Sequence, residues 1–112
     1  TVRRDPDFGL VLTLGAGGVL VEILHDSATM LLPAPPSAIA GALDRLKIAP
    51  ILKGFRGKPG ADREAIVRLV AELAGRMAAD ASIAEIEINP LFAGPAPEGV
   101  TIVDVLIHDF VH

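Results

Sequence analysis

The sequence predicts an α+β domain with a mostly antiparallel sheet and two helices packed on it. Three observations point to this class. Segments with the composition and alternation of strands are joined by short connections rich in glycine and proline, which is typical of antiparallel pairing. Two other segments have the apolar spacing of amphipathic helices. The chain has 112 residues, of which 51% are hydrophobic, so we expect a single domain over residues 1–112.

The first elements expected along the chain are strands. Residues 10–14 and 19–24 are rich in aliphatic side chains and flank the cluster Gly15–Gly18, so we expect them to form a hairpin. A third short strand is expected over residues 28–32. It ends at Pro33, which cannot donate a hydrogen bond to a neighbouring strand.

Two helices are expected next. Ser37 is the candidate N-cap of a short helix. Its apolar face contains Ile39, Leu43 and Leu46. Residues 54–60 combine three glycines with a proline and predict a loop. Asp62 is expected to cap a longer helix. The apolar stripe of that helix consists of Ile66, Leu69, Val70, Leu73 and Met77. Glu and Arg alternate every fourth residue on its other side, which indicates a solvent-exposed face.

The C-terminal part is expected to return to strands. Residues 83–89 alternate with period two, and Pro90 ends that strand or marks it as an edge. A turn over residues 94–99 contains two prolines, and residues 100–107 form a last strand. Short connections of this kind favour antiparallel pairing of the strands that they join.

Composition excludes several classes of function. Ten Lys and Arg against fourteen Asp and Glu give a net charge of −4, which is the wrong sign for binding to nucleic acid. The chain has no cysteine, which excludes disulfides and thiolate chemistry and agrees with a cytoplasmic location. The longest apolar run is too short to cross a membrane. The first residue is Thr, so we expect a fragment of a longer protein.

A candidate metal site lies in the last two expected strands. Alternation places Glu85, Glu87 and Asn89 on one strand face. Asp104 has large apolar neighbours in the last strand, and a carboxylate buried there would need a cation or hydrogen-bond donors. If the two strands pair through residues 91–99, Asp104 comes near Asn89 and Glu87, and the three supply oxygen ligands that Mg²⁺ accepts. The alternative is that Glu85 and Glu87 only form the solvent face of an amphipathic strand.

Two glycine-rich segments are candidate phosphate sites. The backbone N–H groups of Gly15–Gly18 can cradle a phosphate, or the glycines can serve a hairpin turn alone. The segment matches neither a dinucleotide-binding nor a Walker pattern. Arg56 and Lys58 are cations within the second glycine-rich segment, which either reaches phosphate oxygens or is an ordinary exposed loop.

Four motifs occur in an order that resembles one family. They are Arg4–Gly9, the turn Leu14–Val19 running into Val21-Glu22, the loop Gly54–Pro59 followed by Asp62, and Glu85–Leu91. Together they resemble the C-terminal part of the ATP-grasp domain of NDP-forming acyl-CoA synthetases, relatives of succinyl-CoA synthetase. The resemblance covers residues 3–107. It implies a fold like the C-terminal ATP-grasp subdomain and a chain that is a fragment of a larger ATP-grasp domain.

The resemblance also implies roles for particular residues. Glu87, Asn89 and Asp104 would hold the magnesium ion on the phosphates of ATP or ADP. The residues Gly15, Gly17, Gly18, Glu22 and Arg56 would lie at the nucleotide. The family usually has Lys where His25 stands, so His25 is not taken as the phosphohistidine. No residue of this chain is expected to be catalytic in itself.

The function implied by the resemblance is that of one half of an ATP-grasp domain in an ADP-forming acyl-CoA synthetase, which makes acyl-CoA from an acid, CoA and ATP. The remaining ATP-grasp half and the CoA-binding and ligase domains would be partners, in the same protein or a partner subunit, and the parent would be an oligomer. The isolated fragment would be inactive. One alternative is a non-catalytic regulatory module, for example in a protein acetyltransferase fusion. Another is an interaction domain without a ligand.

Overall fold

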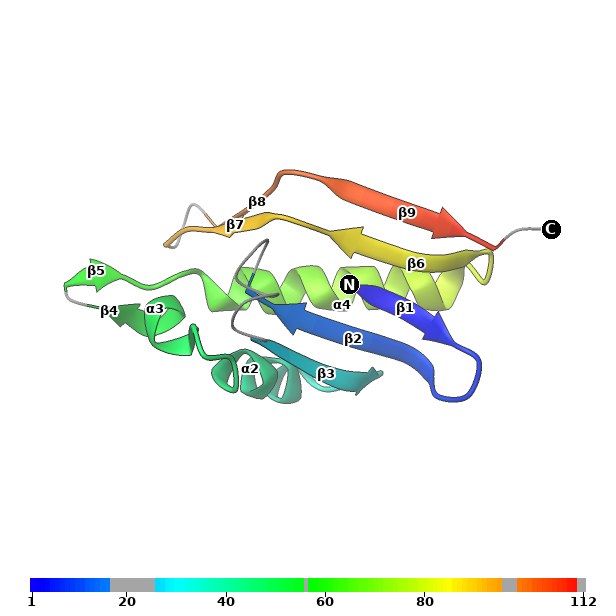
Figure 1. Ribbon diagram of the computed structural model, residues 1–112, viewed down its shortest axis with the longest axis horizontal. Coiled ribbons are helices and arrows are strands. Elements are labelled where there is room, and N and C mark those ends of the chain that lie inside the picture. The colour runs from blue at the N-terminus through cyan, green and yellow to red at the C-terminus, as the bar shows by residue number, and fades with distance from the viewer. Residues whose placement is uncertain (17–25, 56, 96–98, 111–112) are drawn as a thin grey trace.

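The computed structural model describes residues 1–16, 26–55, 57–95 and 99–110. This part of the chain forms an antiparallel sheet of five strands in the order β3-β2-β1-β6-β9, with helices on one face (Figure 1). The strands are β1 (Val2–Asp5), β2 (Gly9–Gly15), β3 (Ser27–Leu32), β6 (Ile83–Ile88) and β9 (Val105–Asp109). The helices are α2 (Pro36–Asp44), α3 (Ala49–Lys53) and α4 (Arg63–Ala79). The α+β class with a mostly antiparallel sheet is therefore confirmed, with α3 as a short helix that the sequence did not predict.

The core lies between the sheet and the two longer helices. Val2, Leu12 and Ile86 are buried on three adjacent central strands and face α2 and α4. Their packing partners on the helices are Ile39, Val70 and Met77. A second buried cluster consists of Leu43, Leu46 and Ile66. β9 lies at the edge of the sheet and is exposed along its whole length. None of the helices in the described ranges is long and apolar enough to span a membrane.

The hairpin expected between residues 10–14 and 19–24 is wrong. β2 pairs with β1 on one side and with β3 on the other, so both of its edges are occupied. Residues 19–24 lie outside the described residues. The short strand β3 ends at Leu32 before Pro33, as predicted.

Two prolines mark the start of α2, and an aspartate caps the start of α4. Ser37 is not the N-cap of α2, because Pro35 has that position and Pro36 is the first helical residue, where the missing N–H costs nothing. The Asp62 carboxylate accepts a hydrogen bond from the Ala65 N–H at 3.1 Å, which confirms it as the cap of α4. The charged side chains of α4 at positions 64, 68, 72 and 76 are exposed, as expected.

The segment expected to be a loop at residues 54–60 contains a small ladder. β4 (Gly54–Phe55) pairs with β5 (Lys58–Pro59) around Gly57, whose φ is 76°. Gly60 packs against the end of α3 so closely that a Cβ there would lie 2.5 Å from the Leu52 carbonyl oxygen. The segment is therefore fixed against α3 by contact of backbone with backbone.

The C-terminal end of α4 is held by an arginine from the first strand. The Arg4 guanidinium donates to the carbonyl oxygens of Met77, of Asp80 at 3.3 Å and of Ile83 at 3.4 Å. The last carbonyls of a helix have no partner within it and carry its negative dipole end, which a cation satisfies. Arg4 thus fixes the helix layer to β1.

Candidate functional site

One long hairpin carries the three predicted metal ligands. β6 pairs with β9 in a register that places Glu87 opposite Leu106. The Asn89 N–H then donates to the Asp104 carbonyl at 3.2 Å, and the same register continues through β7 (Leu91–Ala93) and β8 (Val100–Ile102). The pairing through residues 91–99 is as predicted. The expected single strand over residues 100–107 is divided into β8 and β9.

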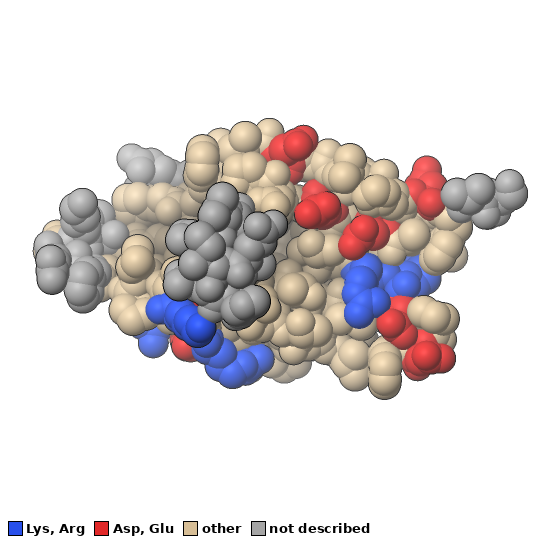
Figure 2. Space-filling view, viewed as in Figure 1, with Lys and Arg blue, Asp and Glu red and all other residues tan. Residues whose placement is uncertain are grey.

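The hairpin brings Glu87, Asn89 and Asp104 together on one face. With Leu106 they line a cavity of about 180 Å³. Residues that pair directly across an antiparallel ladder point to the same side, which explains why all four face the cavity. The neighbouring Ile86 is buried in the core, so this is the face away from the helices. Figure 2 shows acidic side chains gathered over β6 and β9 there.

The reasoning that Asp104 needs a partner because it is buried is wrong. Asp104 is exposed, as are Ile102 and Leu106, because β9 is an edge strand with little packed against it. Asp104 belongs to the site because strand pairing places it beside Asn89, not because its carboxylate is buried. Glu85, which shares the strand face of Glu87, does not line the cavity and lies 3.8 Å from the His108 imidazole.

The donor set has the chemistry that Mg²⁺ requires. Glu87 and Asp104 offer carboxylate oxygens and Asn89 an amide oxygen, all of them hard ligands in an open cavity. Within the described ranges, no group of three or more His, Cys, Asp or Glu side chains is placed to hold a metal ion. Mg²⁺ commonly needs only one or two carboxylates, since waters and substrate phosphates complete its shell. The residues present therefore fit the ion.

Of the predicted nucleotide-binding residues, only Gly15 lies within the described part of the chain. It ends β2 and pairs with Ser27 at the start of β3. Gly17, Gly18, Glu22 and Arg56 lie outside the described residues, and so does His25.

Asp26 is a buried residue that the sequence reasoning missed. It is 2% exposed, and its carboxylate accepts hydrogen bonds from the N–H groups of Lys47 at 2.5 Å and Ile48 at 3.0 Å. The Ala16 N–H donates to the Asp26 carbonyl at 3.0 Å. Asp26 therefore joins the start of α3 to the sheet beside the glycine cluster. In the sequence, its only signal is that Asp26 lies between the aliphatic residues 19–24 and the strand expected over residues 28–32.

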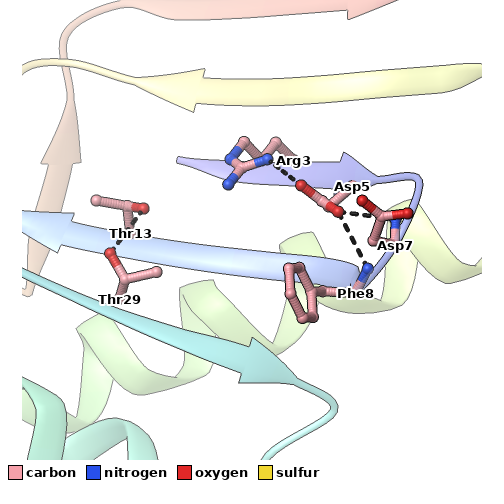
Figure 3. A network of polar contacts seen from close by, with 6 residues as sticks. All are labelled: Arg3, Asp5, Asp7, Phe8, Thr13 and Thr29. Atoms are coloured by element: carbon pink, nitrogen blue, oxygen red, sulfur yellow. Dashed lines mark hydrogen bonds and ion pairs between the residues drawn. The ribbon is translucent and has the colours of Figure 1, made fainter.

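The turn between β1 and β2 is organised by Asp5 (Figure 3). Its carboxylate accepts hydrogen bonds from the N–H groups of Asp7 at 2.8 Å and Phe8 at 3.0 Å, and it pairs with Arg3 at 3.0 Å. The bond from Asp7, the pair with Arg3 and the bond from Phe8 hold the pKa of Asp5 below its ordinary value. Phe8 is 68% exposed at the tip of the turn. The motif Arg4–Gly9 thus has a structural explanation.

Comparison with known proteins decides the family. A family model described as an ATP-grasp domain matches residues 1–108. The chain belongs to the ATP-grasp domain family. The resemblance found in the sequence is therefore confirmed, and the matched range covers almost the whole chain.

Curated relatives of this ATP-grasp chain are CoA ligases. It is 41% identical over 105 residues to a trans-feruloyl-CoA synthase from an unidentified prokaryote, covering 94% of this chain and 15% of the relative. It is 35% identical over 108 residues to the beta subunit of the ADP-forming acetate–CoA ligase II of Pyrococcus furiosus, covering 95% of this chain and 45% of that subunit. The ATP-grasp chain thus spans less than half the length of these relatives.

Solved structures agree. The ATP-grasp chain superposes with a TM-score of 0.86 and 34% identity on the dinucleotide-forming acetyl-coenzyme A synthetase 1 of Candidatus Korarchaeum cryptofilum, in complex with coenzyme A and Mg-AMPPCP. The match covers 97% of this chain and 50% of that one. The phosphorylated form of the same synthetase, in complex with coenzyme A and acetyl-coenzyme A, matches with a TM-score of 0.84 and 32% identity. It covers 95% of this chain and 46% of that chain.

Proposed function

We propose that this chain is the Mg-ATP-binding half of an ATP-grasp domain in an ADP-forming acyl-CoA synthetase. One observation carries the proposal. The oxygen donors Glu87, Asn89 and Asp104 share one cavity on the open face of the sheet, in a chain of the ATP-grasp family. The long hairpin explains how residues fifteen positions apart, Asn89 and Asp104, act as one unit, because their backbones are bonded to each other at 3.2 Å.

The residues of the hairpin would hold the ion and orient the nucleotide. A bound magnesium supplies positive charge that offsets the charge of the ATP phosphates. Glu87 and Asp104 provide the negative charge that attracts the cation, and Asn89 adds a neutral oxygen ligand. Because ladder hydrogen bonds fix the backbone at all three positions, the donors need little reorganisation when the ion arrives.

The reaction class follows from the relatives. In the proposed reaction a carboxylic acid, CoA and ATP give an acyl-CoA thioester, ADP and phosphate. The remaining ATP-grasp half and the CoA-binding and ligase domains would supply the phosphohistidine and the acyl and CoA sites, so the isolated chain would be inactive. In this proposal the chain is one domain of a larger protein, and that protein is an oligomer. The nucleotide roles of Gly15, Gly17, Gly18, Glu22 and Arg56 belong to the same proposal. A cytoplasmic location stays a prediction from the sequence.

The test uses the full-length protein and any partner subunit. ADP formation is measured with and without CoA and Mg²⁺ over a panel of acids that includes acetate, 4-hydroxybutyrate and ferulate, the acids named in the relatives. We expect turnover that requires an acid, CoA and Mg²⁺ together. Tight nucleotide binding without turnover on any acid would instead indicate a regulatory module.

The site is tested by Asp104→Asn, which removes one charge with little change in shape. We expect kcat/KM to fall by on the order of 100-fold, the usual scale for losing a charge-stabilising group, and the Mg²⁺ requirement to rise. The matched control is Asp109→Asn, because Asp109 at the end of β9 is exposed like Asp104 but does not line the cavity. Equal activity of the two variants would contradict the metal site.

A further inference from the structure

A row of three charged or titratable side chains lies next to the metal cavity. Arg3 on β1 is opposite Glu85 on β6, and Glu85 is opposite His108 on β9. Arg3 and Glu85 alternate with Val2 and Ile86, which are buried against the helices, so the row is on the open face of the sheet. Figure 2 shows basic side chains beside the acidic ones on this face. We call Arg3, Glu85 and His108 the charged row.

The charged row is one step along the strands from the proposed metal ligands. Glu87 follows Glu85 by two positions on the same face of β6, so about 7 Å separate their backbones. The cavity extends from Glu87 to Asn89 and Asp104, in the direction away from the charged row. The side chain of Arg3 is therefore long enough to reach a group that is bound at the Glu87 end of the cavity.

Arg3 is held in place, but only one of its nitrogens has a partner. Its Nη1 donates to Asp5 Oδ2 at 3.0 Å, and Asp5 Oδ1 is itself held by two N–H groups of the turn (Figure 3). The Nε and Nη2 atoms have no partner among the residues that the structure describes. The Glu85 carboxylate on the opposite strand pairs instead with the His108 imidazole at 3.8 Å. Because 47% of the Arg3 side chain is exposed, the two nitrogens are accessible to a ligand.

The unused edge of the Arg3 guanidinium has the geometry that recognises phosphate. Nε–H and Nη2–H are parallel donors, which bind two oxygens of one phosphate or carboxylate group. Asp5 and Glu85 are acidic neighbours that repel a free anion. An anion that arrives with its own Mg²⁺ is not repelled in this way. Under the proposed function, Mg²⁺ between Glu87 and Asp104 brings such a phosphate into the cavity.

We propose that Arg3 binds the terminal phosphate of Mg-ATP through Nε and Nη2, at the Glu87 end of the metal cavity. This assignment rests on the proposed function and adds to it a residue that holds the last phosphate. The choice of the terminal phosphate follows from the direction of the strands. β2 passes Thr1 and ends at Gly15, toward the Asn89 end of the cavity. A nucleotide held at Gly15 would therefore extend its last phosphate toward Arg3.

The test measures binding instead of turnover, in the full-length protein with any partner subunit. The probes are Mg-AMPPCP, which has a terminal phosphate that is not hydrolysed, and Mg-ADP, which lacks that phosphate. Isothermal titration calorimetry gives the Kd of each. Arg3→Met removes the guanidinium and keeps an unbranched apolar stem, and Arg3→Lys keeps the charge near Asp5 without the two parallel donors. The matched control is Arg68→Met, because Arg68 is an exposed arginine of α4, on the other side of the sheet.

We expect Arg3→Met to weaken the binding of Mg-AMPPCP by about 10- to 100-fold, the scale of hydrogen bonds to a charged group, and that of Mg-ADP by less than about twofold. Arg3→Lys should show the same selective loss at a smaller size, and Arg68→Met should change neither Kd. An unchanged Kd for Mg-AMPPCP in Arg3→Met, or an equal loss for both nucleotides in Arg3→Lys, would overturn this role of Arg3 alone. If the unsubstituted protein binds neither nucleotide, the proposed function fails, and the role of Arg3 with it.

Discussion

Replacing Gly60 by alanine should destabilise the domain, and the structure sets the size of the effect. The added Cβ would lie 2.5 Å from the Leu52 carbonyl oxygen, 2.6 Å from the Lys53 carbonyl carbon and 2.8 Å from the Lys53 carbonyl oxygen. Ordinary contact begins at 3.4 Å, so the backbone must separate by 3.4 − 2.5 = 0.9 Å. The atoms in the way are backbone atoms, and no side chain can rotate to relieve the contact.

Moving the two backbone segments apart lowers the free energy of unfolding. Overpacking of this kind costs about 1–3 kcal/mol. The Ala61 N–H donates to the same Leu52 carbonyl at 2.7 Å, and weakening that bond adds about 1 kcal/mol. We therefore expect Gly60→Ala to lower the free energy of unfolding by about 2–4 kcal/mol.

The matched control has the opposite sign. Gly75 lies within α4, is exposed, and a Cβ there would meet nothing within 4 Å. Gly75→Ala should stabilise the helix by about 1 kcal/mol, the difference in helix propensity between the two residues. Urea unfolding of the full-length protein, followed by far-UV circular dichroism, compares the two variants. A midpoint for Gly60→Ala at or above that of the unsubstituted protein would refute the steric reasoning.

Two further predictions concern aspartates. Asp26→Ala removes the acceptor of two backbone N–H groups, and each bond to a charged group contributes about 1.5–3 kcal/mol. We expect the free energy of unfolding in urea to fall by about 3–5 kcal/mol. A loss no larger than that of Asp44→Ala would contradict this, because in the described residues Asp44 pairs with the side chains of Arg63 and Lys53 at the surface. Because the pKa of Asp5 is lowered, its stabilising effect is complete above the ordinary pKa and is lost as the pH falls through the folded value. The difference in melting temperature between the unsubstituted protein and Asp5→Asn should therefore be largest at pH 7 and shrink toward pH 3, and a difference independent of pH would exclude this role.

The sequence was informative where the structure depends on neighbours along the chain. Strand alternation and one short connection were enough to place Asn89 opposite Asp104, because the register of a hairpin follows from its turn. The Asp62 cap and the exposed charges of α4 were predictable for the same reason, since a cap and a helix face depend on residues three or four positions apart.

The failures concern contacts between distant segments. β2 pairs with β1 on one edge and with β3 on the other, and local composition does not say which segments pair with which edge. Arg4 reaches carbonyls more than seventy positions away, which no local pattern reports. The apolar neighbours of Asp104 in the sequence suggested a buried environment. Burial depends, however, on what packs beneath a strand, and little packs beneath the edge strand β9.

The long hairpin keeps one register from Glu85 to Ala93 on one arm and from Val100 to His108 on the other, and this limits how its length can change. An extra residue between Gly94 and Gly99, whose backbones are bonded at 2.9 Å, would enlarge the tip and leave both arms as they are. One extra residue in β8 would shift everything that follows it by one position and turn Asp104 from the open face toward the helices. An added pair, one residue in β7 and one in β8, would restore the alignment. Insertions should therefore be tolerated at the tip. Within the arms, between the tip and the register shift at Ile83 and Glu85, they should be tolerated only in matched pairs.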